Sequence, residues 1–393
     1  MRRLTLAAAL APLALLVLPV PAGASTAAPT DALDRALETA RAKTKAPGVT
    51  AAIVKDGAVV WSGASGLAVD PAGEPMRRGA PALRLPPVPV REQTLMSIAS
   101  LTKTYTATVV LRLAEQGRLR LDDPVARFLP HVPGARRVTV RQLLGHTSGY
   151  PDVEHHPAFT RYVQRRETYD PAVRWTRGRM IALTSAPAFR PGSRFEYSNT
   201  NYLLLGSIAE RASGTPLAAL LDRFVTGPLR LRDTLLTYDR LPLARVAHGY
   251  YRLGGRQLLD TWSGRRSAPT NLFGPTWPAG GIAATATDAA RFLDALQRGR
   301  LLRPATLRAM QRVHSPASPY GLGLERYGFG GGTWFGHSGG DGGYTSLALT
   351  DRRAGVTISV LSNQFELNAA GTDSAPGSSA GHVWLALMKA NAR

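Results

Sequence analysis

The stretch Ser100–Gly117, SLTKTYTATVVLRLAEQG, decides how the rest of the sequence is interpreted. It predicts a buried helix over Ser100–Gln116, which Gly117 closes because glycine is favoured just past a helix C-terminus. Ser100 and Lys103 are three positions apart at the start of this helix, a spacing that places two side chains on one face. The lysine amine can therefore reach the serine hydroxyl.

This Ser-x-x-Lys pair is suited to nucleophilic catalysis. A serine hydroxyl is a poor nucleophile until a base removes its proton, and a lysine can be that base when burial keeps it partly neutral. The start of a helix adds a favourable dipole and a free backbone N–H for an oxyanion. Two ordinary helix residues are the alternative, but Lys103 is the only one of five lysines with serine three positions before it.

Two further motifs follow along the chain. Among twelve tyrosines, only Tyr197 has asparagine two positions later, at Asn199. A tyrosine near a cationic lysine can shuttle protons, and an asparagine can orient a substrate amide. His337-Ser338-Gly339 is the only His-x-Gly among eight histidines and lies on a predicted strand. Glycine at this place lets a substrate backbone lie close against the strand.

The remaining pattern predicts a mixed α+β fold. Expected helices are Asp31–Thr44, Arg141–Leu144 (with a Thr139/Gln142 capping box), Tyr202–Ala212, Pro216–Val225, Asp288–Gln297 (capped by Thr287) and His382–Ala392. Expected strands are 48–55 and 58–62, turned at Asp56-Gly57, then Gly321–Glu325, Thr333–His337, Tyr344–Thr350 and Val356–Ser362, while Asp70–Arg91 is expected to be a loop. We therefore expect an antiparallel sheet built from both termini and flanked by helices, with an inserted, mainly helical lobe.

The first residues and the composition indicate export. Arg2 and Arg3 precede the apolar run Leu4–Leu18, and Ala22-Gly23-Ala24 then offers a cleavage site, so residues 1–24 are predicted to be a signal peptide rather than a membrane anchor. With no other apolar span, no stable membrane span is expected after cleavage. Residues 25–393 are predicted to form one bilobal domain, with an α/β lobe at about 29–103 and 280–393 and a helical lobe at about 104–279.

Cysteine and charge exclude several classes of function. The absence of cysteine excludes disulfides, thiolate catalysis and cysteine-ligated zinc. The net charge of +21 comes from arginine spread along the chain, without the basic stripe and module of a nucleic-acid-binding protein. An arginine-favouring genome explains this charge, and attraction to an anionic surface such as a cell wall is the functional alternative.

The order Ser-x-x-Lys, Tyr-x-Asn, His-x-Gly resembles the penicillin-recognising serine hydrolases, on the branch of class C β-lactamases, D-alanyl-D-alanine carboxypeptidases and related esterases. The resemblance covers most of the mature chain and includes LLGHTSG at Leu143–Gly149, FEYSN at Phe195–Asn199 and PAGGI at Pro278–Ile282. It implies a β-lactamase/transpeptidase-like fold, and a structural turn beneath the site at His146–Gly149.

The resemblance also implies the roles of the site residues. Ser100 would be the acyl-enzyme nucleophile, Lys103 the proton acceptor and Tyr197 the general acid/base facing the leaving group. Asn199, Ser338, Gly339 and Gly340 would bind substrate, and His337 would complete the network beside Tyr197. The backbone N–H groups of Ser100 and Gly340 would form the oxyanion hole.

The expected function is that of an exported serine hydrolase without metal or cofactor. A D-alanyl-D-alanine carboxypeptidase or a short-chain esterase is expected, acting on a small-molecule or peptidoglycan-derived acyl substrate. Asp341 weakens the carboxypeptidase interpretation, because peptidase relatives place a hydroxyl residue after the glycines. His337 in place of lysine, with no obvious carboxylate base near the motifs, argues against rapid β-lactam turnover. A class C-like β-lactamase and a weakly active penicillin-binding or regulatory protein remain alternatives.

Two rival interpretations concern other residues. Gly336–Gly340 also matches the Gly-x-Ser-x-Gly nucleophile elbow of α/β-hydrolases, with Ser338 as nucleophile. However, the elbow must lead into a helix, whereas this segment continues into four glycines and a strand pattern. Asp152, Glu154, His155 and His156 resemble a metal cluster, but adjacent histidines do not share a helix face, so a solvated loop is favoured.

Overall fold

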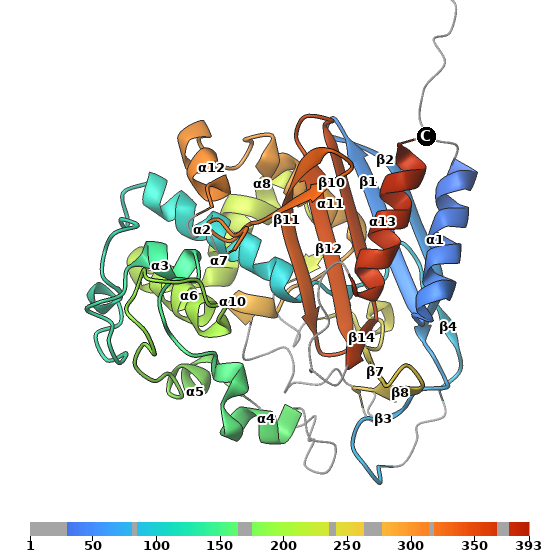
Figure 1. Cartoon of the computed structure of the whole chain (residues 1–393), viewed down its shortest axis with the longest axis horizontal. Coiled ribbons are helices and arrows are strands. Elements are labelled where there is room, and N and C mark those ends of the chain that lie inside the picture. The colour runs from blue at the N-terminus through green and yellow to red at the C-terminus, as the bar shows by residue number, and fades with distance from the viewer. Residues whose placement is uncertain are drawn as a thin grey trace, which may run out of the picture.

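Strands from both ends of the sequence pair in one seven-stranded antiparallel sheet (Figure 1). The computed structural model describes residues 30–80, 85–163, 175–235, 241–262, 277–313, 318–367 and 377–392. The strand order is β10 (Glu325–Phe329), β11 (Gly332–Asp341), β12 (Tyr344–Asp351), β13 (Val356–Ser362), β1 (Gly48–Lys55), β2 (Ala58–Val69) and β4 (Val88–Pro89). The first strand therefore pairs with β13, more than three hundred positions later, from Val49 opposite Ser362 to Lys55 opposite Val356.

Helices cover both faces of this sheet, which explains why β1 is buried along nearly its whole length. On one face, α1 (Thr30–Thr44) and α13 (Ser379–Asn391) pack side by side, and Leu37, Trp61 and Trp384 belong to the core beneath them. On the opposite face, α11 (Ala286–Gln297) contacts β1, β12 and β13. The core on this second face is continuous with the interior of the helical part of the molecule.

The helical part lies beside the edge of the sheet that β10 and β11 form, and it surrounds the buried helix α2 (Figure 1). Its helices are α2 (Thr102–Glu115), α3 (Val140–Leu144), α4 (Pro157–Val163), α5 (Arg177–Ile181), α6 (Asn199–Ser213), α7 (Leu217–Leu221), a π-helical turn (Asp222–Thr226), α8 (Gly227–Leu229), α10 (Trp277–Gly280) and α12 (Pro304–Gln311). Short 3-10 turns occur at Ala99–Leu101, Val125–Arg127, Val153–His155 and Leu243–Arg245.

Two small sheets complete the described structure. One has the order β14 (Gln364–Leu367), β7 (Tyr250–Leu253), β8 (Gln257–Asp260) and β3 (Glu74–Pro75). The other has the order β5 (Met96–Ser97), β9 (Ala283–Ala284) and β6 (Thr234–Leu235). The second sheet places the strand before Ser100 against the segment that follows α10, so it connects two parts of the site.

The predicted fold class is confirmed, and three local expectations are corrected. Ser100 lies in the 3-10 turn before α2, not inside the helix. The cap of α11 is Thr285, whose side chain accepts a hydrogen bond from the Asp288 N–H, rather than Thr287. The expected strand Gly321–Glu325 starts instead at its last residue. Gly321 has no room for a Cβ against the Met310 carbonyl oxygen, and Gly323 has φ +79, which breaks an extended strand.

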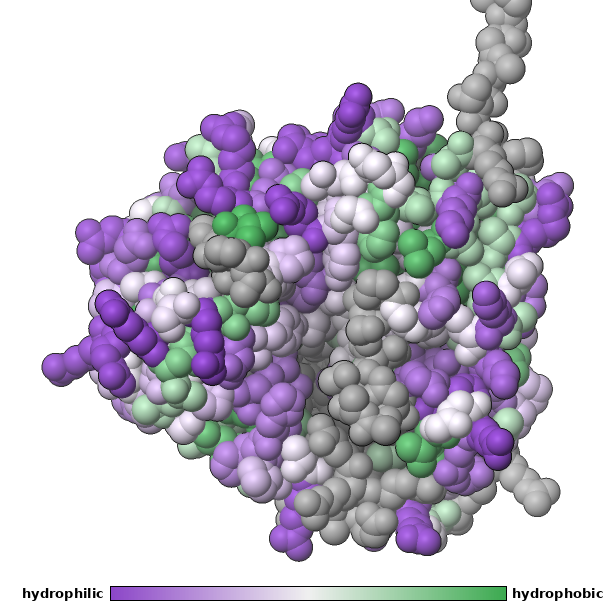
Figure 2. Space-filling model, in the orientation of Figure 1, coloured by the Kyte–Doolittle hydropathy of each residue, from purple (hydrophilic) through white to green (hydrophobic). Residues whose placement is uncertain are grey.

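The other expectations have different outcomes. The capping box of Thr139 and Gln142 is present, and the loop expected over Asp70–Arg91 contributes the short strands β3 and β4. The signal peptide predicted for residues 1–24 lies outside the described residues, and the division into two lobes stays a prediction. None of the described helices combines the length and the apolar character that a bilayer span requires. On the face in Figure 2, strongly hydrophilic residues are scattered rather than gathered in one stripe.

Candidate active site

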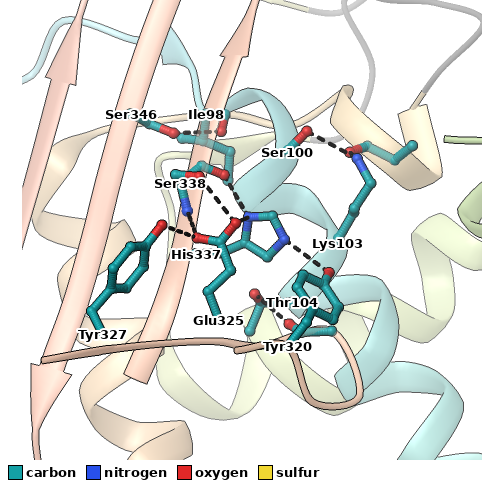
Figure 3. A network of polar contacts seen from close by, with 12 residues as sticks. Ile98, Ser100, Lys103, Thr104, Tyr320, Glu325, Tyr327, His337, Ser338 and Ser346 are labelled. Atoms are coloured by element: carbon teal, nitrogen blue, oxygen red, sulfur yellow. Dashed lines mark hydrogen bonds and ion pairs between the residues drawn. The ribbon is translucent and has the colours of Figure 1, made fainter. Parts of the chain in front are cut away.

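Ser100 is presented by a tight turn that is tied to the sheets on both sides. The Ile98 N–H donates to the Ile282 carbonyl, and the Ile98 carbonyl accepts a hydrogen bond from the Ser346 hydroxyl at 2.7 Å (Figure 3). Ala99 is fully buried and has φ +45, a left-handed conformation that a non-glycine residue adopts only where the surroundings enforce it. The turn therefore holds the Ser100 side chain and its backbone N–H in a fixed place.

Lys103 is fully buried one turn further along α2. Its Nζ donates to Ser100 Oγ at 2.9 Å, to Asn199 Oδ1 at 2.6 Å and to the Ala279 carbonyl at 2.9 Å. These three acceptors use all three donors of an ammonium group. When the group loses a proton, its lone pair can face the Ser100 hydroxyl, and the other two contacts can keep the amine in place.

Burial is the main influence on the charge of Lys103. Loss of hydration lowers its pKa to about 8, against the opposing effect of the carboxylates of Glu154, Asp152, Asp341 and Glu325. A lysine with a pKa near 8 is neutral in an appreciable fraction of molecules at neutral pH. Burial thus gives Lys103 the partly neutral state that a catalytic base requires.

Tyr197 and Asn199 approach from the start of α6. The Lys103 Nζ lies 4.9 Å from the centre of the Tyr197 ring, and the Tyr197 hydroxyl shares a hydrogen bond with Ser100. Burial raises the pKa of Tyr197 well above its usual value, so its hydroxyl stays protonated. Asn199 is oriented by Asp152 Oδ2, which accepts from both the backbone N–H and the side-chain amide of Asn199 at 3.0 Å.

His146 supports Tyr197 from behind. The two rings stack with centres 4.2 Å apart, and His146 Nδ1 accepts from the Ser198 N–H at 3.1 Å. His146 is completely buried and has φ +53. Burial, with the charges of Lys103 and His337, holds its pKa well below the usual value. His146 is therefore a neutral residue that supports Tyr197. This agrees with the structural turn that the resemblance implies for His146–Gly149.

His337 lies on β11, next to the site but turned into the interior. Only 1% of its surface is exposed; Nε2 is bonded to the Tyr320 hydroxyl at 2.9 Å and Nδ1 to the Ser338 carbonyl. Its ring centre is 6.5 Å from that of Tyr197. Burial, followed by the Lys103 charge, lowers the pKa of His337, while Glu325 opposes the shift. His337 thus contacts Tyr320, whose ring lies beside that of Tyr197. A direct hydrogen-bond network between His337 and Tyr197 stays a prediction.

Gly339 lets β11 pass close to Ser100, and Gly340 leaves room for the Phe365 ring. A Cβ on Gly339 would lie 2.5 Å from both the Ile98 carbonyl oxygen and Ser346 Oγ, and 2.9 Å from the Ser100 nitrogen. The approach of the protein's own turn therefore requires glycine at this position, and the expected contact of a substrate backbone with it stays a prediction. A Cβ on Gly340 would lie 2.6 Å from the ring of Phe365.

Four carboxyl groups interact electrostatically with Lys103, although the motifs themselves contain no obvious carboxylate base. Asp341 and Glu154 both interact with Lys103 and with Asp152. Burial raises the pKa of Asp341 to about 6, and it raises the pKa of Glu154 well above its usual value. Asp341 follows directly after the glycines of the third motif, whereas no local pattern in the sequence reveals that Glu154 interacts with Lys103.

The two rival interpretations fail on this geometry. Ser338 lies inside β11, which turns directly into β12, so it is not at a strand-to-helix elbow. In the part of the chain that the structure describes, no three histidine, aspartate or glutamate side chains are placed to hold a metal ion. His155 and His156 are exposed as a solvated loop predicts, but Asp152 holds Asn199 and is thus part of the site.

Comparison with known proteins agrees with this arrangement. The Beta-lactamase family model matches residues 33–377. Esterase EstB from Burkholderia gladioli is 33% identical over 83% of this chain and 81% of its own length. Two solved structures are similar: a D-stereospecific amidohydrolase from Streptomyces sp. (29% identity, TM-score 0.67, 85% and 94% of the two chains) and the D-amino acid amidase of Ochrobactrum anthropi SV3 (26%, TM-score 0.74, 92% and 97%).

Proposed function

The chain belongs to the Beta-lactamase family and is a serine hydrolase of that family, and from this premise we propose that Ser100 is its nucleophile and Lys103 its base. The observation that carries the proposal is the hydrogen bond of 2.9 Å between Lys103 Nζ and Ser100 Oγ, in a place where burial lowers the lysine pKa to about 8. A base with a pKa close to the working pH is the most effective proton acceptor.

In acylation, the neutral Lys103 amine takes the Ser100 proton while Oγ forms a bond to the substrate carbonyl carbon. The carbonyl electron pair moves to the oxygen, which the N–H groups of Ser100 and Gly340 face. When this intermediate collapses, the bond to the leaving group breaks and the leaving group receives a proton from Tyr197. Tyr197 then regains a proton from the Lys103 ammonium, and a water molecule repeats the sequence on the ester to release the acid.

The carboxylates at the centre favour an acyl donor that carries a positive charge. Asp341, Glu154 and Asp152 interact electrostatically with one lysine cation. Burial raises the pKa of Asp341 to about 6 and that of Glu154 well above its usual value, and the Asp152 charge adds to both shifts. A substrate ammonium group beside these carboxyl groups would favour their ionised forms. The same carboxylates disfavour the terminal carboxylate of a D-alanyl-D-alanine peptide. We therefore infer that small esters and amides of amino acids with a free amine are the preferred substrates.

The similar proteins support the stereochemistry and the bond type of this proposal. One of them is named as an esterase, and two are named for D-stereospecific amide chemistry. A D-aminoacyl ester or amide would suit both the ester and the amide chemistry of these relatives, and its ammonium group would suit the carboxyl groups of the site. The sequence-based candidates, a short-chain esterase and a D-alanyl-D-alanine carboxypeptidase, differ from it only in the groups on either side of the scissile bond.

Matched substrates test this proposal. We expect D-alaninamide to be hydrolysed faster than L-alaninamide and faster than N-acetyl-D-alaninamide, which lacks the ammonium group. The KM of D-alaninamide should fall as the pH rises through about 6, because Asp341 ionises there. Asp341→Asn should raise that KM roughly 10-fold and leave hydrolysis of nitrophenyl acetate nearly unchanged.

The remaining candidates are separated by the same assay. Equal rates for the free and acetylated amides would contradict the ammonium proposal. Nitrocefin hydrolysed far faster than every ester and amide would make the protein a class C-like β-lactamase. Acylation of Ser100 without turnover of any substrate would indicate a penicillin-binding or regulatory protein.

We propose in addition that the enzyme acts outside the cytoplasm. The signal-peptide pattern of residues 1–24 supports this, and the net charge of +21 supports attraction to an anionic cell wall. Secretion of the full chain into the culture medium or periplasm, with mass spectrometry of the new N-terminus, tests the first part. Release of the protein from isolated cell walls by salt tests the second.

A further inference from the structure

The pairing of strand β11 with β10 ends before β11 reaches the site. In the described residues, β10 pairs with β11 from Phe329 opposite Gly332 to Glu325 opposite Gly336, and the pairing ends there. The following segment, His337–Asp341, pairs with β12 on its other side. A strand edge without a neighbour leaves backbone N–H groups that need another acceptor.

The Glu325 side chain supplies that acceptor. Its Oε2 accepts the Ser338 backbone N–H at 2.8 Å, and its Oε1 accepts the Ser338 hydroxyl at 3.1 Å (Figure 3). The Tyr327 hydroxyl donates to the same carboxylate at 2.7 Å and so restrains it from β10. Only 17% of the Glu325 side chain is exposed. The carboxylate thus continues the edge where the strand pairing ends.

The same carboxylate also orients the histidine of the third motif. Glu325 Oε1 lies 3.7 Å from His337 Nδ1, and the Ser338 carbonyl oxygen contacts that nitrogen as well. Two negatively polarised groups at Nδ1 favour a proton on this nitrogen. In the neutral ring, Nε2 is then the acceptor of the Tyr320 hydroxyl. The Ser338 carbonyl and Glu325 thus fix the ring orientation and the tautomer of His337 together.

We propose that Glu325 is a positioning residue for acyl transfer: it holds the His337–Gly340 segment of β11 against Ser100. This inference rests on the proposed function of Ser100 and Lys103. It follows from the two bonds of Glu325 to Ser338, two residues before the Gly340 N–H that faces the oxyanion in the proposed reaction.

The experiment compares Glu325→Gln, Glu325→Ala and the control Tyr327→Phe in the full chain. The glutamine variant keeps an acceptor for the Ser338 N–H, so it should recover most of the wild-type kcat. The alanine variant loses this acceptor, and its kcat should fall roughly 100-fold with a nearly unchanged KM. Tyr327→Phe, which keeps both Ser338 bonds, should lower kcat only a few-fold.

Each outcome separates this proposal from the proposed function. If the wild-type enzyme shows no acyl-enzyme on Ser100, the proposed function fails regardless of Glu325. If the wild type is acylated and the alanine variant keeps its kcat, the positioning role is refuted. If the glutamine variant loses as much kcat as the alanine variant, the acceptor for the Ser338 N–H is not what matters, and the positioning role is refuted as well. A lower melting temperature with unchanged kinetics in both variants would show that Glu325 serves stability alone.

Discussion

The reaction centre has two sides that are built in opposite ways. On the side of α2, Ser100 and Lys103 are three positions apart, and their contact follows from the geometry of one helical turn. On the side of β11, His337 and Gly339 depend on residues from other elements, among them Tyr320, Glu325 and Ser346. The difference shows that the chemical groups are defined locally, whereas the surface that faces them is defined by tertiary packing.

The largest loss of activity is expected at the nucleophile. Ser100→Ala should abolish covalent labelling by an active-site acylating reagent, since the attacking oxygen is lost. Ser338→Ala should slow turnover only a few-fold, because Ser338 Oγ contacts Glu325 and its backbone N–H remains bonded. Intact-mass measurement after labelling checks both variants. Labelling that survives in Ser100→Ala and disappears in Ser338→Ala would move the nucleophile to β11.

The second effect tests whether the α2 side needs a base or only a charge. Lys103→Arg should reduce acylation nearly as much as Lys103→Ala, by roughly 100- to 10,000-fold, because a guanidinium group stays protonated and cannot accept the serine proton. Single-turnover acylation with a nitrophenyl ester measures it. An arginine variant that retains a substantial rate would show that a positive charge is sufficient beside Ser100.

The smallest loss of acylation rate is expected on the β11 side. Gly339→Ala should lower acylation by about 10- to 100-fold, because the new methyl group would lie 2.5 Å from the Ile98 carbonyl oxygen and displace the turn that carries Ser100. Gly328→Ala on β10 is the matched control, since a Cβ there meets no atom within 4 Å. Equal rates for both variants would mean that close packing of β11 on the turn does not matter for catalysis.

The sequence could predict what depends on short spacings. It predicted the antiparallel sheet from both termini, the capping box of α3, the Ser100–Lys103 pair and the strand that carries His337. The individual strands, the capping box and the Ser100–Lys103 pair follow from alternation, helical spacing or turn residues within a few positions. The assembly of one sheet from both termini follows from the order of strands and helices along the chain. The boundary errors at Gly321–Glu325 and Thr287 arose where a close approach or a side-chain cap outweighed the local pattern.

The missed site residues share a different property. Glu325 and Asp152 act through partners on other elements, as in the bond between Asp152 and the Asn199 amide across 47 positions. Asp152 stood out in the sequence only as part of a possible metal cluster, and nothing near it pointed to Asn199. Glu325 carried no signal of its partner Ser338. His146 offered one usable signal, its place in the HTSG turn, but its stacking on Tyr197 required the folded arrangement.

The pairing of β1 with β13 has a consequence for the order in which the chain folds. One edge of β1 can pair with β2 as soon as both strands emerge during synthesis, but its other edge has to wait for β13, which ends at Ser362. Long sequence separation between partners slows folding because the loop must close before the contacts form. The central sheet is therefore completed only after nearly the whole chain has been made.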